Sequence, residues 1–144
     1  MLIADVNIFV YAYRTDAQDH ERYREWLTDA LEGDEPFGIY DHVLSGFLRV
    51  VTNPRAWQMP SRMEEALEFV AVVSDAPAAV WVSPGPRQWQ IFESLCRRPS
   101  IRGNLVPDAF YAALAIEHSA IWITNDGGFA RFPNLRWRHP FDPF

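Results

Sequence analysis

The sequence predicts an α/β fold of three layers, α/β/α, in which a central, mostly parallel sheet has helices on both faces. Two observations support this prediction. Short apolar segments suited to buried strands recur along the chain, and segments with apolar residues at helical spacing separate them. Strands that alternate with helices pair in parallel, because each helical crossover returns the chain to the same edge of the sheet.

The expected elements follow one another over the whole chain. Strands are predicted at residues 2–4, 37–40, 80–82, 121–124 and 135–137, and helices at 7–13, 19–31, 43–51, 63–74, 89–95 and 107–118. Gly33 closes the second helix, Asn53-Pro54 ends the third, and Pro107 suits the first turn of the last. A chain of 144 residues buries one core, so a single domain over residues 1–144 is expected.

Charge and cysteine content exclude several classes of protein. The formal net charge of −6 argues against a protein that coats nucleic acid, because such proteins present a basic face. It does not exclude a nuclease, since a metal bound by carboxylates reverses the local sign of charge. The single cysteine, Cys96, rules out a disulfide within the chain. The first residues resemble neither a leader peptide nor a membrane span, so a cytoplasmic protein is expected.

Three aspartates follow or begin predicted elements. Asp5 directly follows the strand at 2–4, Asp126 lies two residues beyond the strand at 121–124, and Asp108 lies in the first turn of the helix at 107–118. In an open parallel sheet these positions converge at one edge, where carboxylates suit Mg2+ or Mn2+. Each acid also has a simpler explanation, as a helix cap, a turn residue or a favourable charge at a helix start.

Four segments, in register over nearly the whole chain, resemble one family. They are residues 2–7 (LIADVN), 43–55 (VLSGFLRVVTNPR), 103–109 (GNLVPDA), and 122–126 (WITND) with 129–137. The chain resembles the PIN-domain ribonucleases, particularly the VapC toxins of bacterial toxin-antitoxin pairs. The resemblance implies a PIN-like fold, a Mg2+- or Mn2+-dependent endoribonuclease acting on RNA, a cognate antitoxin and a homodimer.

The resemblance also implies roles for individual residues. Three acids would bind the metal and two polar residues would orient them or their waters; these are Asp5, Asp108 and Asp126, with Asn7 and Thr124. Arg49 resembles an arginine that commonly follows the second acid of the family. On the residues alone, Arg49 is equally well explained as a surface residue of an amphipathic helix.

The chain departs from the family pattern at two glycines. Gly46 stands where many relatives have a glutamate, and we expect Asp41, about one and a half turns earlier by helical spacing, to substitute as a catalytic acid. As a simple helix N-cap, Asp41 would need no metal. Gly128 stands where the family often has a further aspartate. We therefore expect one metal to be held firmly and a second only when RNA is present.

Basic and aromatic residues suggest partners. Arg131, Arg136 and Arg138 are predicted to contact RNA as a local patch, although a solvated rim explains them equally well. Six tryptophans and ten phenylalanines suggest some exposed apolar surface, for a second copy or an antitoxin, with an aromatic-rich core as the alternative.

Three functions therefore compete. The first is a metal-dependent endoribonuclease toxin. The second, motivated by Gly46, is a catalytically weakened PIN-like module that binds RNA without cutting it. The third is a phosphatase with an aspartyl nucleophile at Asp5, which is disfavoured because that chemistry usually has a second acid where this chain has Asn7.

Overall fold

The central sheet is parallel throughout. The computed structural model describes residues 1–143, and its five strands are β1 (Leu2–Ala4), β2 (Phe37–Tyr40), β3 (Ala79–Val82), β4 (Ile121–Ile123) and β5 (Arg136–Arg138). They are ordered β3-β2-β1-β4-β5, and each neighbouring pair is parallel. Leu2 is in register with both Phe37 and Ile121, so the carboxyl ends of the central strands lie at one edge.

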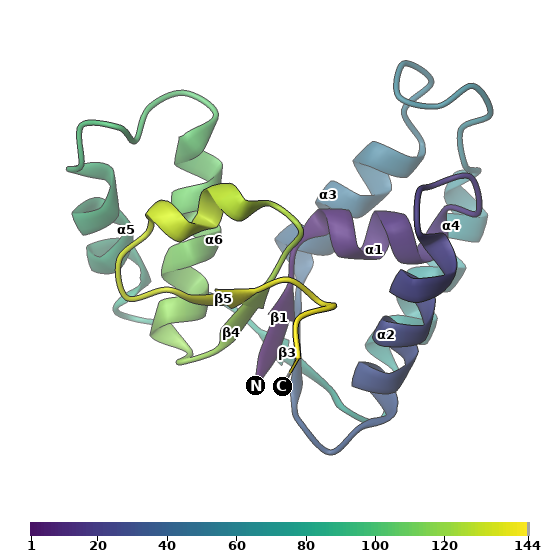
Figure 1. Cartoon of the computed structure of the whole chain (residues 1–144), viewed down its shortest axis with the longest axis horizontal. Coiled ribbons are helices and arrows are strands. Elements are labelled where there is room, and N and C mark those ends of the chain that lie inside the picture. Colours follow the sequence, from purple (N-terminus) through teal and green to yellow (C-terminus); the bar gives the residue numbers. More distant parts are fainter. Residues whose placement is uncertain (144) are drawn as a thin grey trace.

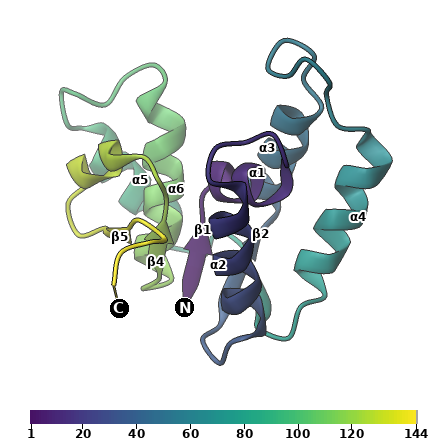
Figure 2. The same ribbon diagram turned by 45° about the vertical axis from the view of Figure 1, so that its right-hand side comes forward.

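The helices form the two outer layers and confirm the α/β/α prediction. They are α1 (Val6–Tyr13), α2 (His20–Glu32), α3 (Asp41–Val51), α4 (Met63–Ser74), α5 (Gln88–Cys96), α6 (Leu105–Glu117) and the short 3-10 helix η1 (Gly127–Arg131). Helices α1 to α4 lie on one side of the sheet, and α5, α6 and η1 lie on the other (Figures 1 and 2). The change of side places a topological switch point between β1 and β4.

The core is built from the strands and the inner faces of the helices. Ile3, Phe37 and Trp122 are fully buried strand residues, and Phe47 of α3 is buried as completely. Helix α6 packs through an alanine face that is almost without exposed area, formed by Ala109, Ala112, Ala113 and Ala115. Small side chains allow a helix to lie close to a sheet, so this face brings the start of α6 near the ends of β1 and β4.

Several local expectations need correction. Asp41 is the first residue of α3 rather than its N-cap, which is Tyr40, and no side chain caps this helix. Helix α6 begins at Leu105, two residues before the expected start at Pro107. Leu67 of α4 is 47% exposed, although its apolar side chain would suit a buried face. Only Ala66 and Val73 of that helix are buried, so α4 packs through a narrower face than its composition suggests.

The helices of the described residues were compared with what a membrane-crossing helix requires. Within residues 1–143, none of the helices combines the length and the apolar composition that spanning a bilayer requires.

Candidate active site

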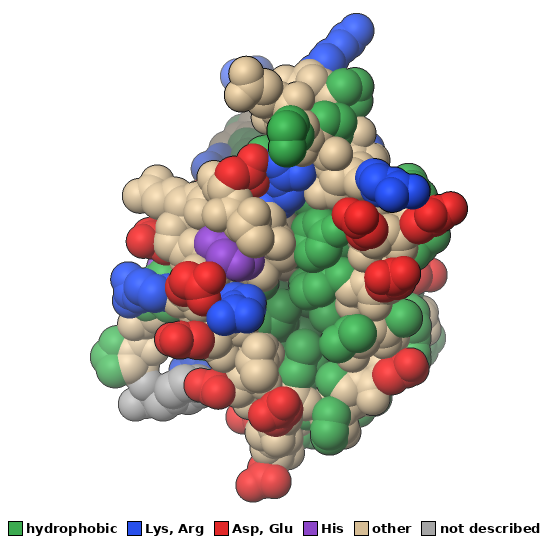
Figure 3. All heavy atoms as spheres, turned by 90° about the vertical axis from the view of Figure 1, so that its right-hand side faces the viewer, with side chains coloured by type: hydrophobic (Ala, Val, Ile, Leu, Met, Phe, Trp, Pro, Cys, Tyr) green, Lys and Arg blue, Asp and Glu red, His purple; other side chains and the backbone are tan. Residues whose placement is uncertain are grey.

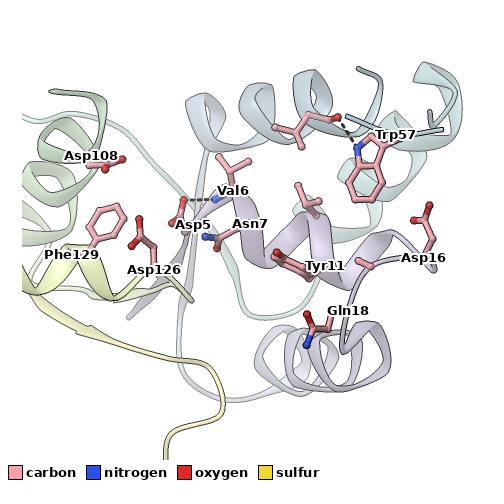
Figure 4. A pocket seen from close by; sticks show the side chains of 13 residues that line it. Asp5, Val6, Asn7, Tyr11, Asp16, Gln18, Trp57, Asp108, Asp126 and Phe129 are labelled. Carbon is pink, nitrogen blue, oxygen red and sulfur yellow. Dashed lines mark hydrogen bonds between the residues drawn. The ribbon is translucent and has the colours of Figure 1, made fainter. Parts of the chain in front are cut away.

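A cavity of about 610 Å³ opens at the carboxyl edge of the sheet, and the three predicted acids lie in its wall (Figure 4). Asp5 follows β1, Asp126 follows β4, and Asp108 lies in the first turn of α6. We call this space the aspartate cavity; its wall also includes Asn7, Tyr11 and Trp57. It lies at the switch point between β1 and β4, where open parallel sheets generally bind ligands.

Asp5 is the most enclosed of the three acids, with only 9% of its surface exposed. Its Oδ1 accepts a hydrogen bond of 2.7 Å from the Val6 backbone, and its Oδ2 accepts one of 2.6 Å from the Thr124 hydroxyl. Burial raises the pKa of Asp5 to about 6, and the negative charges of Asp108 and Asp126 contribute to the increase. The carboxylate is therefore held in a place where a cation would compensate it.

Thr124 joins two of the acids. Its side chain is fully buried, and its hydroxyl donates to Asp5 while accepting from the Asp126 backbone N–H at 3.1 Å. The Asp126 carboxylate in turn accepts from the Gly128 N–H at 2.8 Å and so caps η1. One hydroxyl thus fixes the ends of β1 and β4 relative to each other, which agrees with the supporting role proposed for Thr124.

Asp108 reaches the cavity from the first turn of α6, whereas Asp5 and Asp126 reach it from the ends of β1 and β4 (Figure 4). Partial burial raises the pKa of Asp108, the charge of Asp126 raises it further, and the guanidinium of Arg131 opposes the change. Arg131 Nε donates to the Gly128 carbonyl at 2.7 Å. A positive charge therefore stands beside Asp108 and the turn that carries Asp126.

The closing turn is tight at Gly128. A Cβ there would lie 2.9 Å from Oδ1 of Asp126 and 3.0 Å from an Arg131 nitrogen. A side chain at this position would therefore displace the ends of both side chains.

The donor types around the cavity fit a hard divalent cation. Four carboxylates line it, which are Asp5, Asp108 and Asp126 at one end and Asp16, paired with Arg14, at the other. Oδ1 of Asn7 is buried without a hydrogen-bond partner among residues 1–143. Within residues 1–143, however, no three acidic, histidine or cysteine side chains lie close enough together to form a complete metal-binding group. An incomplete set of protein ligands is compatible with Mg2+. This ion usually keeps several waters and binds through one or two carboxylates plus substrate phosphate, rather than through protein side chains alone.

Asp41 and Arg49 lie outside the aspartate cavity. Asp41 is exposed at the start of α3, and Arg49 is exposed near the end of the same helix. The structure therefore does not bring Asp41 to the place that a side chain at Gly46 would occupy. A Cβ on Gly46 would lie 2.9 Å from Cγ2 of Val6 and 3.9 Å from the Tyr111 hydroxyl.

Two of the three arginines predicted to bind RNA point to another part of the molecule. Arg136 donates to the Ser119 carbonyl, which precedes β4. The pKa of Glu35 is lowered first by the N-terminal amine, 2.6 Å away, and then by Arg138 and Arg136. Since Glu35 precedes β2, these two charges act near the amino edge of the sheet. Arg131 alone of the three lies beside the acids.

Two residues near the cavity were missed by sequence reasoning. Trp57, on the loop between α3 and α4, lines the cavity, and the guanidinium carbon of Arg14 lies 4.2 Å from the centre of its ring. The available signal was a tryptophan in a loop without helical or strand periodicity, directly after the turn at Asn53-Pro54.

Comparison with known proteins identifies the family. The sequence profile of the PIN domain matches residues 2–135. Ribonuclease VapC43 of Mycobacterium tuberculosis is 46% identical over 142 residues, which cover 99% of this chain and 97% of the relative. Ribonuclease VapC25 of the same species is 36% identical over 140 residues, which cover 97% and 99%.

Solved structures share the fold at low sequence identity. The crystal structure of VapBC2 from Rickettsia felis bound to a DNA fragment from their promoter superposes with a TM-score of 0.68 at 20% identity, and the match covers 96% of this chain and 97% of that one. The fold, the order of the motifs and the full-length relatives agree. The chain therefore belongs to the PIN domain family, among the VapC ribonucleases.

Proposed function

We propose that this protein is a metal-dependent endoribonuclease that acts in the cytoplasm as the toxin of a toxin-antitoxin pair. The observation that supports this most directly is the convergence of Asp5, Asp108 and Asp126 on one cavity at the switch point of the sheet. Full-length relatives named ribonucleases support RNA as the substrate.

Asp5, Asp108 and Asp126, with the amide oxygen of Asn7, would supply the ligands of a Mg2+ or Mn2+ ion in this cavity, and waters and the substrate phosphate would fill the positions that these side chains do not reach. When bound, such an ion lowers the pKa of a water and neutralises charge on a phosphodiester. Thr124 keeps Asp5 oriented through its 2.6 Å hydrogen bond. Arg131 places a positive charge beside Asp108, where it can meet the scissile phosphate.

Arginines on two loops supply a path for the RNA backbone on either side of the acids. The loop between α3 and α4 and the loop between α5 and α6 both project beyond the helices at the carboxyl edge of the sheet (Figure 1). They present five exposed arginines, which are Arg55 and Arg62 on the first loop and Arg97, Arg98 and Arg102 on the second. Exposed guanidinium groups pair with phosphates, so a locally basic rim can bind RNA on an acidic protein.

The test is cleavage of a single-stranded RNA with Mg2+, with Mn2+ and with EDTA. We expect cleavage only with metal, and Asp5→Asn or Asp108→Asn should reduce the rate by at least about a hundredfold, the scale of a lost electrostatic catalytic group. Asp29→Asn, at an exposed position of α2, is the matched control and should retain full activity. Cleavage that persists in EDTA, or in both cavity variants, would contradict the proposal.

A catalytically weakened RNA-binding module remains the second candidate, and Gly46 is the observation that favours it. Gly46, packed beside Val6 and Tyr111, supplies no carboxylate to add to Asp5, Asp108 and Asp126. This alternative predicts RNA binding that is as tight in EDTA as in Mg2+, and no cleavage under either condition. The same cleavage assay, combined with a binding titration, separates the two candidates.

An antitoxin and a second copy of the chain are the proposed protein partners. The face that carries α2 and α4 has a strip of hydrophobic side chains (Figure 3), and α4 exposes Met63, Leu67 and Val72. Exposed apolar area of this kind is typical of protein interfaces. Light scattering of the purified protein, alone and with the product of the adjacent gene, measures both associations; a monomer that binds no such product would contradict this part.

A further inference from the structure

The aspartate cavity extends well beyond the acids, and its far end is aromatic. From Asp5 it continues along α1, past Val10 and Tyr11, to the indole of Trp57, which lies at the opposite end from Asp108 (Figure 4). Metal binding and hydrolysis require only the acidic end. The remaining length is available to a part of the substrate next to the reacting phosphate.

The indole of Trp57 is held in a fixed position. Its Nε1 donates to the Val50 carbonyl at 3.0 Å, and its backbone N–H donates to the Asn53 carbonyl at 3.3 Å. The Arg14 guanidinium stacks on the ring at 4.2 Å. The ring is nevertheless only partly buried and lines the cavity. Arg14 thus stacks on one face of a ring that also lines the cavity.

Arg14 also removes the charge that would repel RNA at this end. It donates to both carboxylate oxygens of Asp16, at 2.8 and 2.5 Å, and to the Met59 carbonyl and the Ser61 hydroxyl, at 2.8 and 3.0 Å. Asp16 lines the cavity, so its pairing with Arg14 leaves the far end close to neutral. Four of the five N–H donors of the guanidinium are used in these bonds, which makes Arg14 a positioning group for Trp57 and the loop.

We propose that Trp57 is a stacking platform for one unpaired base of the RNA substrate, next to the nucleotide whose phosphate reaches the acids. This inference rests on the proposed function and specifies its substrate as RNA with an unstacked base at a fixed position. Aromatic side chains bind single-stranded nucleic acid in this way, because every base offers a flat π-face. The apolar wall formed by Val10 and Val50 is compatible with a base and excludes a phosphate.

The experiment measures binding of a short single-stranded RNA, and of the same RNA with one abasic nucleotide at each position in turn. The protein is the Asp5→Asn variant, so the RNA stays intact, and Trp57→Ala, Trp57→Phe and Trp89→Ala are added to it. Trp89 is 58% exposed on α5 and is the matched control. Removing a stacked aromatic ring should weaken binding about tenfold to a hundredfold, while Trp57→Phe should lose less and Trp89→Ala nothing.

The decisive result is non-additivity at one position. In the parent protein one abasic position should weaken binding as much as Trp57→Ala does, and in the Trp57→Ala variant that position should have no further effect. The inference is wrong if every abasic position weakens binding equally in the parent protein and in its Trp57→Ala variant. It is also wrong if the Trp57→Ala variant binds the RNA as tightly as the parent does. Trp57→Phe guards against a collapsed loop, since it keeps a flat ring and should keep the position-specific effect.

These outcomes are distinguishable from failure of the proposed function. If the wild-type protein cuts no RNA but the Asp5→Asn protein shows the position-specific effect, the role of Trp57 is supported and the ribonuclease proposal is wrong. If the wild-type protein cuts RNA with metal but the Asp5→Asn protein shows no such effect, the ribonuclease proposal is supported and the role of Trp57 is wrong.

Discussion

Replacing Asp5 by asparagine should stabilise the protein in the absence of metal while abolishing its activity. The side chain is 9% exposed, and burial together with the charges of Asp108 and Asp126 raises its pKa from 3.8 to about 6. At neutral pH the Asp5 carboxyl is ionised in both states, but its ionisation costs more free energy in the folded protein than in the unfolded chain. Residues selected for binding and catalysis often reduce stability in this way.

The size of the effect follows from the pKa. Raising a carboxyl pKa from 3.8 to about 6 costs the ionised folded state ~3 kcal/mol at neutral pH. This cost is already net of the hydrogen bonds that the Thr124 hydroxyl and the Val6 backbone donate to the carboxylate, so asparagine should gain up to ~3 kcal/mol. In a domain of this size that gain raises the melting temperature by up to roughly 10 °C.

The dependence on pH has a defined sign. Because the folded pKa lies above the unfolded value, the folded state binds more protons between about pH 4 and pH 6. The contribution of Asp5 to stability therefore falls as the pH rises through this window, and the cost is fully present above about pH 6. The advantage of Asp5→Asn should grow over the same window and then level off.

Urea unfolding in EDTA measures these differences, at about pH 4.5, 6 and 7.5 to span the window. Asp41→Asn is the control, since Asp41 is exposed at the start of α3; losing a favourable charge there should cost ~0.3–1 kcal/mol. If Asp5→Asn is less stable than wild type at the highest pH, or if its advantage does not change with pH, burial does not destabilise the carboxylate and the reasoning is refuted.

Three further predictions concern other residues of the cavity and its supports. Thr124→Val should cost ~1–3 kcal/mol in urea unfolding, because Asp5 and the Asp126 N–H both lose a buried partner, and should slow cleavage at least about tenfold. Gly46→Glu should not increase cleavage and should cost ~1–3 kcal/mol, since its Cβ meets Val6 at 2.9 Å. Arg14→Ala should speed proteolysis within the loop between α3 and α4, measured by mass spectrometry, because that loop loses two hydrogen bonds and a stacked partner.

The fold and the meeting of the three acids at one edge of the sheet could be predicted from the sequence, because the signals for both are local. A short apolar run ending at Asp5 indicates a buried strand, and the alternation of such runs with amphipathic helices indicates a parallel sheet. Parallel pairing then brings the ends of β1 and β4 to one edge without further information. Asp5 and Asp126 therefore meet for reasons that each neighbouring segment already contains.

The residues that sequence reasoning missed depend on contacts between distant segments. Arg14 reaches the Met59 carbonyl across 45 residues and the Ser61 hydroxyl across 47, and these bonds fix where Trp57 lies. No periodic pattern encodes the path of such a loop. The expectation that Arg136 and Arg138 form one patch with Arg131 differs from the structure for another reason. Residues that are close in sequence need not be close in space. Strand β5 carries the two later arginines toward Glu35 instead.

Gly46 shows why a missing side chain cannot be replaced by the nearest residue of the same type. Asp41 lies on the same helix, but the space beside Gly46 belongs to Val6 and to Tyr111, whose hydroxyl contacts His42 at 3.1 Å and whose ring stacks on Trp122 at 5.4 Å. A side chain at position 46 would first displace Val6, which is the only one of the two neighbours within 3.0 Å of a Cβ there. With Asp5, Asp108 and Asp126 and no further acid at position 46, the acidic end of the cavity carries less negative charge. We propose that a cation held there would therefore retain more positive charge for the substrate phosphate.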